Sequence, residues 1–341
     1  PLGIVAINPL FRLMGVGDSI MPSVDAFMHV WFIGFLFVML GFVGSNFLRA
    51  HGQPKRSAQL QILGCLLNAM LSPLFIFACH WGIRGSAIAG VCARVVVVSG
   101  IYYHLFRYYM PTPKDSFQCA IARCSMYFKR ILSIAIPAIL TNVIGPLSSM
   151  WLVHLLAQFG DVTVAGFGIA SRIEMLALVP LFALSASVGP VIGQNLGAKL
   201  YGRSYDALMK SYWMALYWGG AMTVFLFVLG PAIALCFTAD PAIIHVAALY
   251  LMTLPCSYAS WGVLMMTNAN FNAMGMPFRS TSLTLVRMLV LFIPLSYFFS
   301  LHWHVEGIFV AYVLANVLSS ALAFWMGVTQ WKRYDLTAMT S

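Results

Sequence analysis

The apolar residues of this chain are gathered into long runs instead of alternating with polar residues. Nine runs are about 20 residues or longer, the length that crosses a bilayer as a helix, and a shorter run covers about 1–14. The nine fall near residues 22–48, 58–79, 84–106, 131–158, 163–194, 207–237, 242–272, 282–301 and 305–330. Because ten-residue stretches of strict alternation are absent, the pattern predicts an all-α, polytopic transmembrane helical bundle and not a β-barrel.

The composition agrees with this interpretation. Of the 341 residues, 61% are hydrophobic and 8% are charged, whereas a soluble domain carries about 25% charged residues. The seven cysteines show no CxxC or mixed Cys/His spacing, so we expect no metal site and no cofactor beyond a coupling ion.

The basic residues lie mainly in one set of alternate connections. Fourteen Lys and Arg residues fall on one side of the predicted membrane, and Arg12 and Arg84 fall on the other. We therefore expect the first side, with the carboxy terminus, to face the cytoplasm from the inner (plasma) membrane. On this interpretation the net charge of +10 sets the topology, and we expect the lipid bilayer, not a nucleic acid, as the partner.

Two parts of the chain repeat. Within SNFLRAHGQPKRSAQ, which starts at Ser45, and TNANFNAMGMPFRSTS, which starts at Thr267, the matched residues Gly52 and Gly275 or Pro54 and Pro277 are 223 apart. His80-Trp81 matches His302-Trp303 at an offset of 222. Equivalent connections lie on the same side of the predicted membrane, so the repeats are parallel and predict two pseudo-symmetric lobes.

The repeat also predicts the domain organisation. We place an incomplete amino-terminal lobe at 1–107, a cytoplasmic linker at 108–130, a carboxy-terminal lobe at 131–330 and a cytoplasmic tail at 331–341. The second lobe has six predicted spans and the first has three and a partial one. By symmetry we expect about nine full helices and a partial one of a total of twelve, with the others preceding Pro1.

Several segments resemble the multidrug and toxic compound extrusion (MATE) family. The most specific are LRAHGQPKRS, LLNAMLSPLFIF, WGIRGSAIAG, AGFGIASRIEMLALVP and GQNLGAK. The resemblance implies twelve helices in two lobes of six. It also implies efflux of cationic amphipathic compounds in exchange for protons or sodium.

The family's ion-site residues carry over in part. Many members have Asn-x-x-x-Asp-Pro in the fifth family helix, and here Asn68 matches while Ser72 replaces the carboxylate. Gly90 stands where the sixth helix often has Thr, and Thr141 and Asn142 stand in the region where some members have Glu. These departures favour a proton over a fully ligated sodium ion.

Glu174 is the first candidate coupling residue. It lies about eleven residues into its span, roughly 16 Å deep at 1.5 Å per residue. Because hydrocarbon disfavours the charged form of a carboxyl group, a proton-exchanging role is expected. Arg172 is a second candidate, although residues i and i+2 do not share a helix face. The alternative is a structural Glu bonded to a neighbouring helix.

Two further pairs have i, i+4 spacing and therefore share a helix face. Asp25 with His29 suggests a pH-responsive site, or a solvated pair near the external interface. Asn68 with Ser72 suggests either a cation site or hydrogen bonding between helices.

A substrate cleft is predicted at Thr141 and Asn142, because the nearby Pro137 and Pro146 break the helix and open backbone groups. Asn268 is a third predicted cleft residue. Arg287 can extend to a membrane face by snorkelling or reach a buried acid. Because it follows the cytoplasmic Arg279 by eight residues, we expect snorkelling.

Transport is the function that these features favour. We expect a monomeric, proton- or sodium-driven exporter of small organic cations that works by alternating access. A flippase or exporter of a lipid-linked or other metabolite is the alternative, and it would require basic residues facing the cleft. A membrane-embedded enzyme is disfavoured because no HExxH, GxSxG or paired Asp motif occurs.

Overall fold

The computed structural model describes residues 21–108 and 117–339, and every element in these ranges is helical. The described residues contain eight helical stretches long and apolar enough to cross a membrane. The last stretch, Pro277–Lys332, leaves helical geometry at Trp303 and His304 and so holds two of the predicted runs. The predicted transmembrane helical bundle is therefore confirmed.

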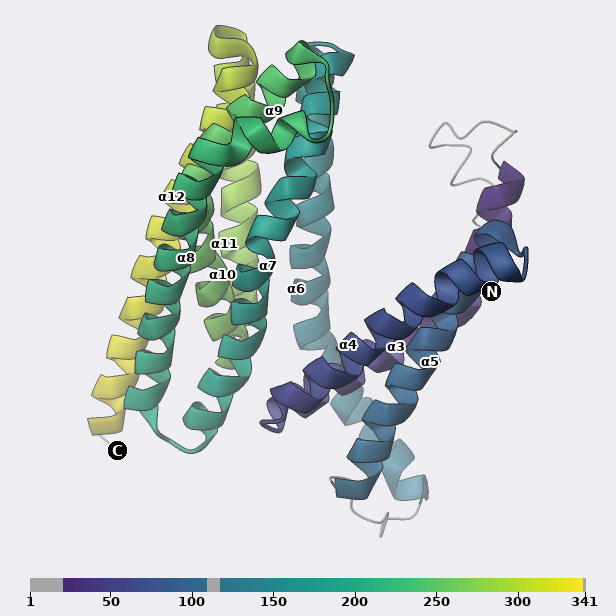
Figure 1. Cartoon of the computed structure of the whole chain (residues 1–341). Helices are drawn as coiled ribbons and strands as arrows, with labels where there is room; N and C mark the ends of the chain where they lie inside the picture. Colours follow the sequence, from purple (N-terminus) through teal and green to yellow (C-terminus); the bar gives the residue numbers. More distant parts are fainter. Residues whose placement is uncertain (1–20, 109–116, 340–341) are drawn as a thin grey trace. The chain divides into compact units, whose positions relative to one another are not determined.

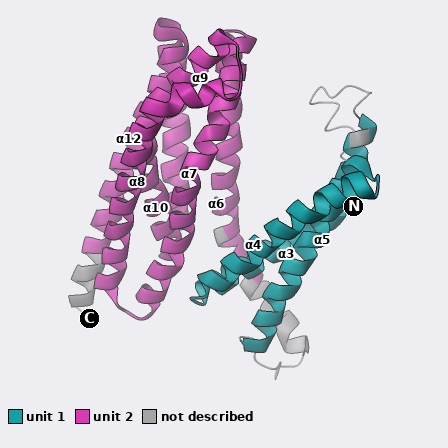
Figure 2. Cartoon of the chain, viewed as in Figure 1, with its two compact units in different colours: residues 1–116 teal, residues 117–341 magenta. Residues whose placement is uncertain are grey.

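The chain divides into two compact units, Pro1–Ser116 and Phe117–Ser341 (Figure 2). The predicted partial run at 1–14 lies outside the described residues. The predicted linker at 108–130 overlaps a helix, because α6 (Phe117–Ala157) is continuous from its first residue. The last helix, α12 (Ile293–Met339), likewise extends beyond the end predicted at residue 330.

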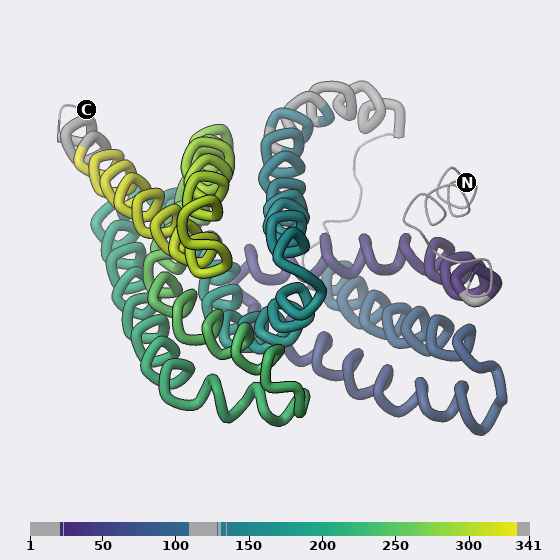
Figure 3. Tube along the Cα trace, turned by 90° about the horizontal axis from the view of Figure 1, so that it is seen from above, coloured from purple at the N-terminus to yellow at the C-terminus, as the bar shows by residue number. Residues whose placement is uncertain are grey.

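Unit 1 is built from α3 (Met21–Ala50), α4 (Pro54–Pro73) with the π-helical turn η1 (Leu74–Ala78), and α5 (Gly82–Tyr108). Helix α5 lies between the other two, as Figure 3 shows. Glycines permit the close approach, since a Cβ on Gly34 would clash with Val91 and one on Gly64 would clash with Val97. A small buried cluster forms where the helices meet: Leu48, Val97, Ile101 and Leu105.

Unit 2 contains α6, α7 (Asp161–Gly197), α8 (Tyr201–Leu235), α9 (Pro241–Thr253), η2 (Leu254–Ser257) and α10 (Tyr258–Ala273). It continues with α11 (Pro277–Leu285), η3 (Val286–Phe292) and α12 (Figure 1). Helix α10 packs against α7, α8 and α12. The largest fully buried side chains of this unit include Tyr250, Tyr258, Phe271, Phe309 and Trp331.

The sequence repeat is visible in the backbone. Gly52 and Gly275 end their helices at φ values of 75° and 73°, a conformation that suits glycine. The residues that follow, Gln53 and Met276, both have φ near −113° with ψ of 52° and 54°. Each of the two next helices, α4 and α11, then begins with proline.

A second backbone match lies at the turns before α5 and within α12. Gly82 and His304, at an offset of 222, have φ values of 53° and 51°. Three residues later, Gly85 and Gly307 each approach a backbone carbonyl so closely that a Cβ would clash with it. The two units thus share local backbone geometry at equivalent positions, although their side chains differ.

Candidate functional site

Glu174 lies on α7 within unit 2. Its side chain is half-buried, and its Oε1 atom is enclosed without a hydrogen-bond partner. Arg172, two residues earlier, is exposed, as expected for a residue on another face of the helix. The structure therefore separates these two predicted coupling residues.

Tyr250 on α9 donates its hydroxyl hydrogen to Oε2 of Glu174. Sequence reasoning missed this residue. Tyr250 is 1% exposed, and the rings of Phe167 and Phe309 meet it edge to face at centroid distances of 5.6 and 5.2 Å. Because both rings pack against the phenol, its hydroxyl is held in place toward the carboxyl group.

Arg287 on η3 is held by polar contacts inside unit 2. Its Nη1 donates to Oδ1 of Asn316 at 2.9 Å, and Nδ2 of Asn316 donates to Oγ of Ser257 at 2.9 Å. The guanidinium also stands 5.9 Å from the ring centroid of Tyr312. Its charge acts on Glu174 through space, although no ion pair involving Glu174 is found among the described residues.

The expectation that Arg287 snorkels to the membrane face is wrong. Arg287 is 9% exposed and hydrogen-bonds to α12 inside unit 2. The side chain turns inward because Asn316 offers a buried acceptor, which a desolvated guanidinium requires.

Three buried polar atoms in this part of unit 2 have no hydrogen-bond partner: Oε1 of Glu174, Nε of Arg287 and the hydroxyl of Tyr258. Tyr258 also interacts electrostatically with Glu174. Unpartnered buried atoms are rare in proteins and need a reason. A carboxyl group that alternates between protonated and ionised forms beside a permanent guanidinium charge would provide one, since its hydrogen-bonding needs change with the proton.

The predicted cleft residues of unit 2 do not converge on Glu174. Thr141 on α6 hydrogen-bonds at 2.8 Å to Thr281 on α11, whereas Asn142 is exposed and donates to Ala138 O of its own helix at 2.8 Å. Asn268 donates to Thr284 at 3.3 Å, and its Oδ1 is buried without a partner.

In unit 1 the structure brings together one predicted pair more directly than the other. Ser72 donates to Oδ1 of Asn68 at 3.0 Å. His29 instead reaches the backbone oxygen of Asp25 at 2.8 Å, and Oδ1 of Asp25 is buried without a partner. The imidazole therefore does not contact the carboxylate in this structure.

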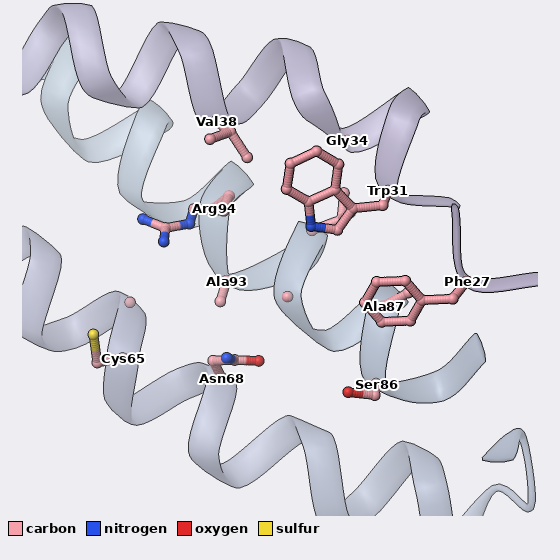
Figure 4. A pocket seen from close by; sticks show the side chains of 13 residues that line it. Phe27, Trp31, Gly34, Val38, Cys65, Asn68, Ser86, Ala87, Ala93 and Arg94 are labelled. Carbon is pink, nitrogen blue, oxygen red and sulfur yellow. The ribbon is translucent and has the colours of Figure 1, made fainter. Parts of the chain in front are cut away.

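A pocket of about 300 Å³ lies among α3, α4 and α5 (Figure 4). Among the residues that the structure describes, Arg94 is the only charged side chain that lines it, and Asn68 and Ser86 supply neutral polar groups. In Figure 4 the rings of Trp31 and Phe27 lie on one side of the view and the guanidinium of Arg94 lies on the other. The other lining residues are Gly34, Val38, Gly64, Cys65, Ala87, Gly90, Val91 and Ala93.

Comparison with known proteins places these features in a family. Residues 137–298 match the family model described as MatE. The FAD transporter of Shewanella oneidensis is 30% identical over 329 residues, which cover 95% of this chain and 72% of that protein. The multidrug export protein MepA of Staphylococcus aureus is 23% identical, covering 98% of this chain and 73% of that protein.

Solved structures agree in fold. The Vibrio cholerae MATE transporter VcmN in its bent form superposes with a TM-score of 0.89 at 24% identity, covering 98% of this chain and 75% of that one. An outward-facing multidrug resistance MATE transporter superposes with a TM-score of 0.87 at 26% identity, covering 97% and 74%.

Proposed function

Since the chain belongs to the MATE family of multi-pass membrane transporters, we propose that it is a secondary active exporter driven by proton exchange. Glu174 carries the coupling proton in this proposal. The carboxyl group is ionised when it has released its proton, and the charge of Arg287 and the hydroxyl of Tyr250 then stabilise it. Proton uptake removes the negative charge and leaves Arg287 as the charged group.

The observation that supports this proposal is the environment of Glu174. A carboxyl group in a membrane span is costly to maintain, so it usually has a functional reason. Here it has one hydrogen bond, one unpartnered oxygen and an arginine within electrostatic range but not in an ion pair. An acid that served only to hold helices together would be expected to have both oxygens satisfied.

Transport proceeds by alternating access in this proposal, with the carboxy terminus in the cytoplasm and a monomer as the working unit. Small organic cations are the first substrate class, in line with the multidrug names of several relatives. Export of an anionic aromatic metabolite is the second candidate. It is favoured by the name of the Shewanella relative and by Arg94, the one charged side chain that the described residues contribute to the unit 1 pocket.

The test is transport into proteoliposomes under an imposed pH gradient or an imposed sodium gradient. The wild-type protein should respond to the pH gradient, and Glu174→Gln should reduce the pH-driven rate to background because the amide cannot exchange a proton. Glu306→Gln is the matched control, since Glu306 is exposed on α12, and it should transport normally.

Two results would count against the proposal. Folded Glu174→Gln protein with the normal pH-driven rate would remove Glu174 as the proton carrier. If transport by the wild-type protein responded to the sodium gradient and not to the pH gradient, sodium and not the proton would be the coupling ion.

A further inference from the structure

The unit 1 pocket exists because small residues replace large ones at equivalent positions of the repeat. At an offset of 222, Ala87 and Gly90 of α5 correspond to Phe309 and Tyr312 of α12. Phe309 is fully buried in unit 2 and packs against Tyr250. Ala87 and Gly90 instead line the pocket. The space that aromatic side chains fill in one unit is thus open in the other.

The two units carry their interior arginines at positions that are not equivalent in the repeat. Arg287 on η3 corresponds to Gly64 on α4 at an offset of 223, and Asn316 on α12 corresponds to Arg94 on α5 at 222. In unit 2, Arg287 bonds to Asn316 and is enclosed. In unit 1, Gly64 and Arg94 both line the pocket, so no arginine stands at the position equivalent to Arg287.

The guanidinium of Arg94 has N–H donors available for a ligand. Its Nη1 donates to Oε1 of Gln61 at 3.2 Å, and its side chain is exposed. A guanidinium presents five N–H donors in a planar fork that matches carboxylate and phosphate groups. No carboxylate lines the pocket within residues 21–108: Asp25, two residues before Phe27 on α3, is not among the lining residues.

We propose that this pocket binds the exported compound and that Arg94 is a specificity-determining residue that selects an aromatic anion. This inference rests on the proposed transport function, and of the two substrate classes given there it favours the second, the aromatic anions, over the organic cations. The anionic group pairs with Arg94, the aromatic system lies against Trp31 and Phe27, and Asn68 and Ser86 bond to neutral polar groups. An aromatic cation would meet an unneutralised guanidinium, which disfavours its binding. The pocket volume lies at the lower end of the range for small-molecule sites.

Two xanthene dyes of similar size and opposite charge test the charge selection. Fluorescein is an aromatic anion at pH 8 and rhodamine 6G is an aromatic cation. Their binding to the purified protein in detergent micelles can be measured by fluorescence anisotropy. We expect fluorescein to bind more tightly than rhodamine 6G, and Arg94→Gln to weaken fluorescein binding about ten-fold or more, as loss of a charge-assisted hydrogen bond does.

Two variants control this measurement. Arg94→Lys keeps the charge and should retain part of the fluorescein affinity. Arg107→Gln removes an exposed arginine of the same helix that bonds to Tyr103 and lies outside the pocket, so it should bind like the wild-type protein.

A further variant, Gly90→Tyr, fills the pocket and leaves Arg94 unchanged. The nearest atom to a Cβ on Gly90 would be Oδ1 of Asn68, at 4.0 Å, so there is room for a side chain to begin at this position. Gly90→Tyr introduces the residue that unit 2 has at this position and should abolish binding of fluorescein. Unchanged fluorescein affinity in folded Arg94→Gln and Gly90→Tyr proteins would overturn the proposal, as would tighter binding of rhodamine 6G by the wild type.

Transport measurements separate this inference from the coupling proposal. If Arg94→Gln lowers fluorescein binding while Glu174→Gln leaves pH-driven transport intact, the coupling proposal fails and the role of Arg94 stands. If Glu174→Gln abolishes pH-driven transport of rhodamine 6G while Arg94→Gln changes neither dye's binding, the coupling stands and the selection by Arg94 is wrong.

Discussion

Units 1 and 2 share local backbone geometry, but the arginine inside unit 2 is buried and the pocket arginine of unit 1 is exposed. In unit 2, Arg287 is 9% exposed and bonds to Asn316. In unit 1, Arg94 is exposed beside a pocket of about 300 Å³. The glycines at the tight turns, Gly85 and Gly307, are the same in both.

The difference indicates which positions of a repeat are tied to the fold and which are available for function. Gly85 and Gly307 face backbone carbonyls that have no alternative place, so a larger residue is excluded in either unit. The interior positions face side chains, which can be exchanged in matched sets. One unit can therefore enclose an acid with its counter-charge while the other keeps an accessible basic group.

The largest expected effect comes from removing the enclosed arginine. Arg287→Leu leaves the buried Oδ1 of Asn316 without its charged donor, which should lower the free energy of unfolding by about 2–3 kcal/mol. Arg94→Leu acts at an exposed position and should change it by about 0.5 kcal/mol or less. Unfolding by SDS in mixed micelles, followed by tryptophan fluorescence, measures both.

Arg287→Lys helps to interpret the result. A lysine keeps the charge but cannot reproduce the planar fork, so its stability should fall between those of the wild type and Arg287→Leu. Equal losses in the Arg287→Leu and Arg94→Leu proteins would show that the contrast between the two arginines has no energetic consequence.

The second largest effect is expected from substituting Gly85 and Gly307, the glycines that approach a backbone carbonyl in each unit. A Cβ at position 85 would stand 2.7 Å from the carbonyl oxygen of Phe75, and a Cβ at 307 would stand still closer to that of Phe299. Gly85→Ala and Gly307→Ala should each cost about 1–3 kcal/mol of stability, with Gly307→Ala the larger. Thermal unfolding of the purified variants would give this order.

Gly220→Ala on α8 is the control for these substitutions, because a Cβ there meets nothing within 4 Å. Alanine in an open helical position should stabilise the protein slightly. If Gly307→Ala proved as harmless as Gly220→Ala, the close approach of the two backbones would not constrain this turn.

A third, smaller effect comes from a residue that differs between the two equivalent turns. His304 adopts φ 51° and ψ −130°, where unit 1 has Gly82 with φ 53°. This region is unfavourable for a side chain, so His304→Gly should raise the stability by about 1 kcal/mol. The ring of His304 also packs edge-on against Phe159 at 5.8 Å. A lower unfolding temperature in His304→Gly would mean that this contact outweighs the backbone strain.

Much of the fold could be predicted because bilayer thickness sets the length of an apolar run. The apolar runs predicted the described spans, including the break between 301 and 305, where Trp303 and His304 leave helical geometry. The helical start of α6 at Phe117 was missed. The first residues of α6 were predicted to be a polar linker, because a helix end that lies outside the bilayer needs no long apolar run and so gives no such signal in the sequence.

The candidate site was only partly predictable. Glu174 stood out as a charge within an apolar run, but its partner Tyr250 lies 76 residues away and resembles any other aromatic residue of a span. Arg287 was placed at the membrane face by its distance along the chain, whereas packing of η3 against α12 turns it toward Asn316. Periodicity gives the face of a helix, but not which other helix packs against it.

The smallest expected effect distinguishes two neighbours on α6. Thr141 hydrogen-bonds to Thr281 on α11, whereas Asn142 is exposed and bonds only within its own helix. Thr141→Val should therefore cost about 1 kcal/mol of stability, the usual value of one hydrogen bond, and Asn142→Ala should cost about 0.5 kcal/mol or less. If Asn142 lines the substrate cleft, Asn142→Ala should lower the transport rate in proteoliposomes while stability holds. Because Asn142 is exposed and its amide bonds only within its own helix, a lowered rate at unchanged stability would place Asn142 in the cleft. A normal transport rate in that variant would remove Asn142 from the cleft.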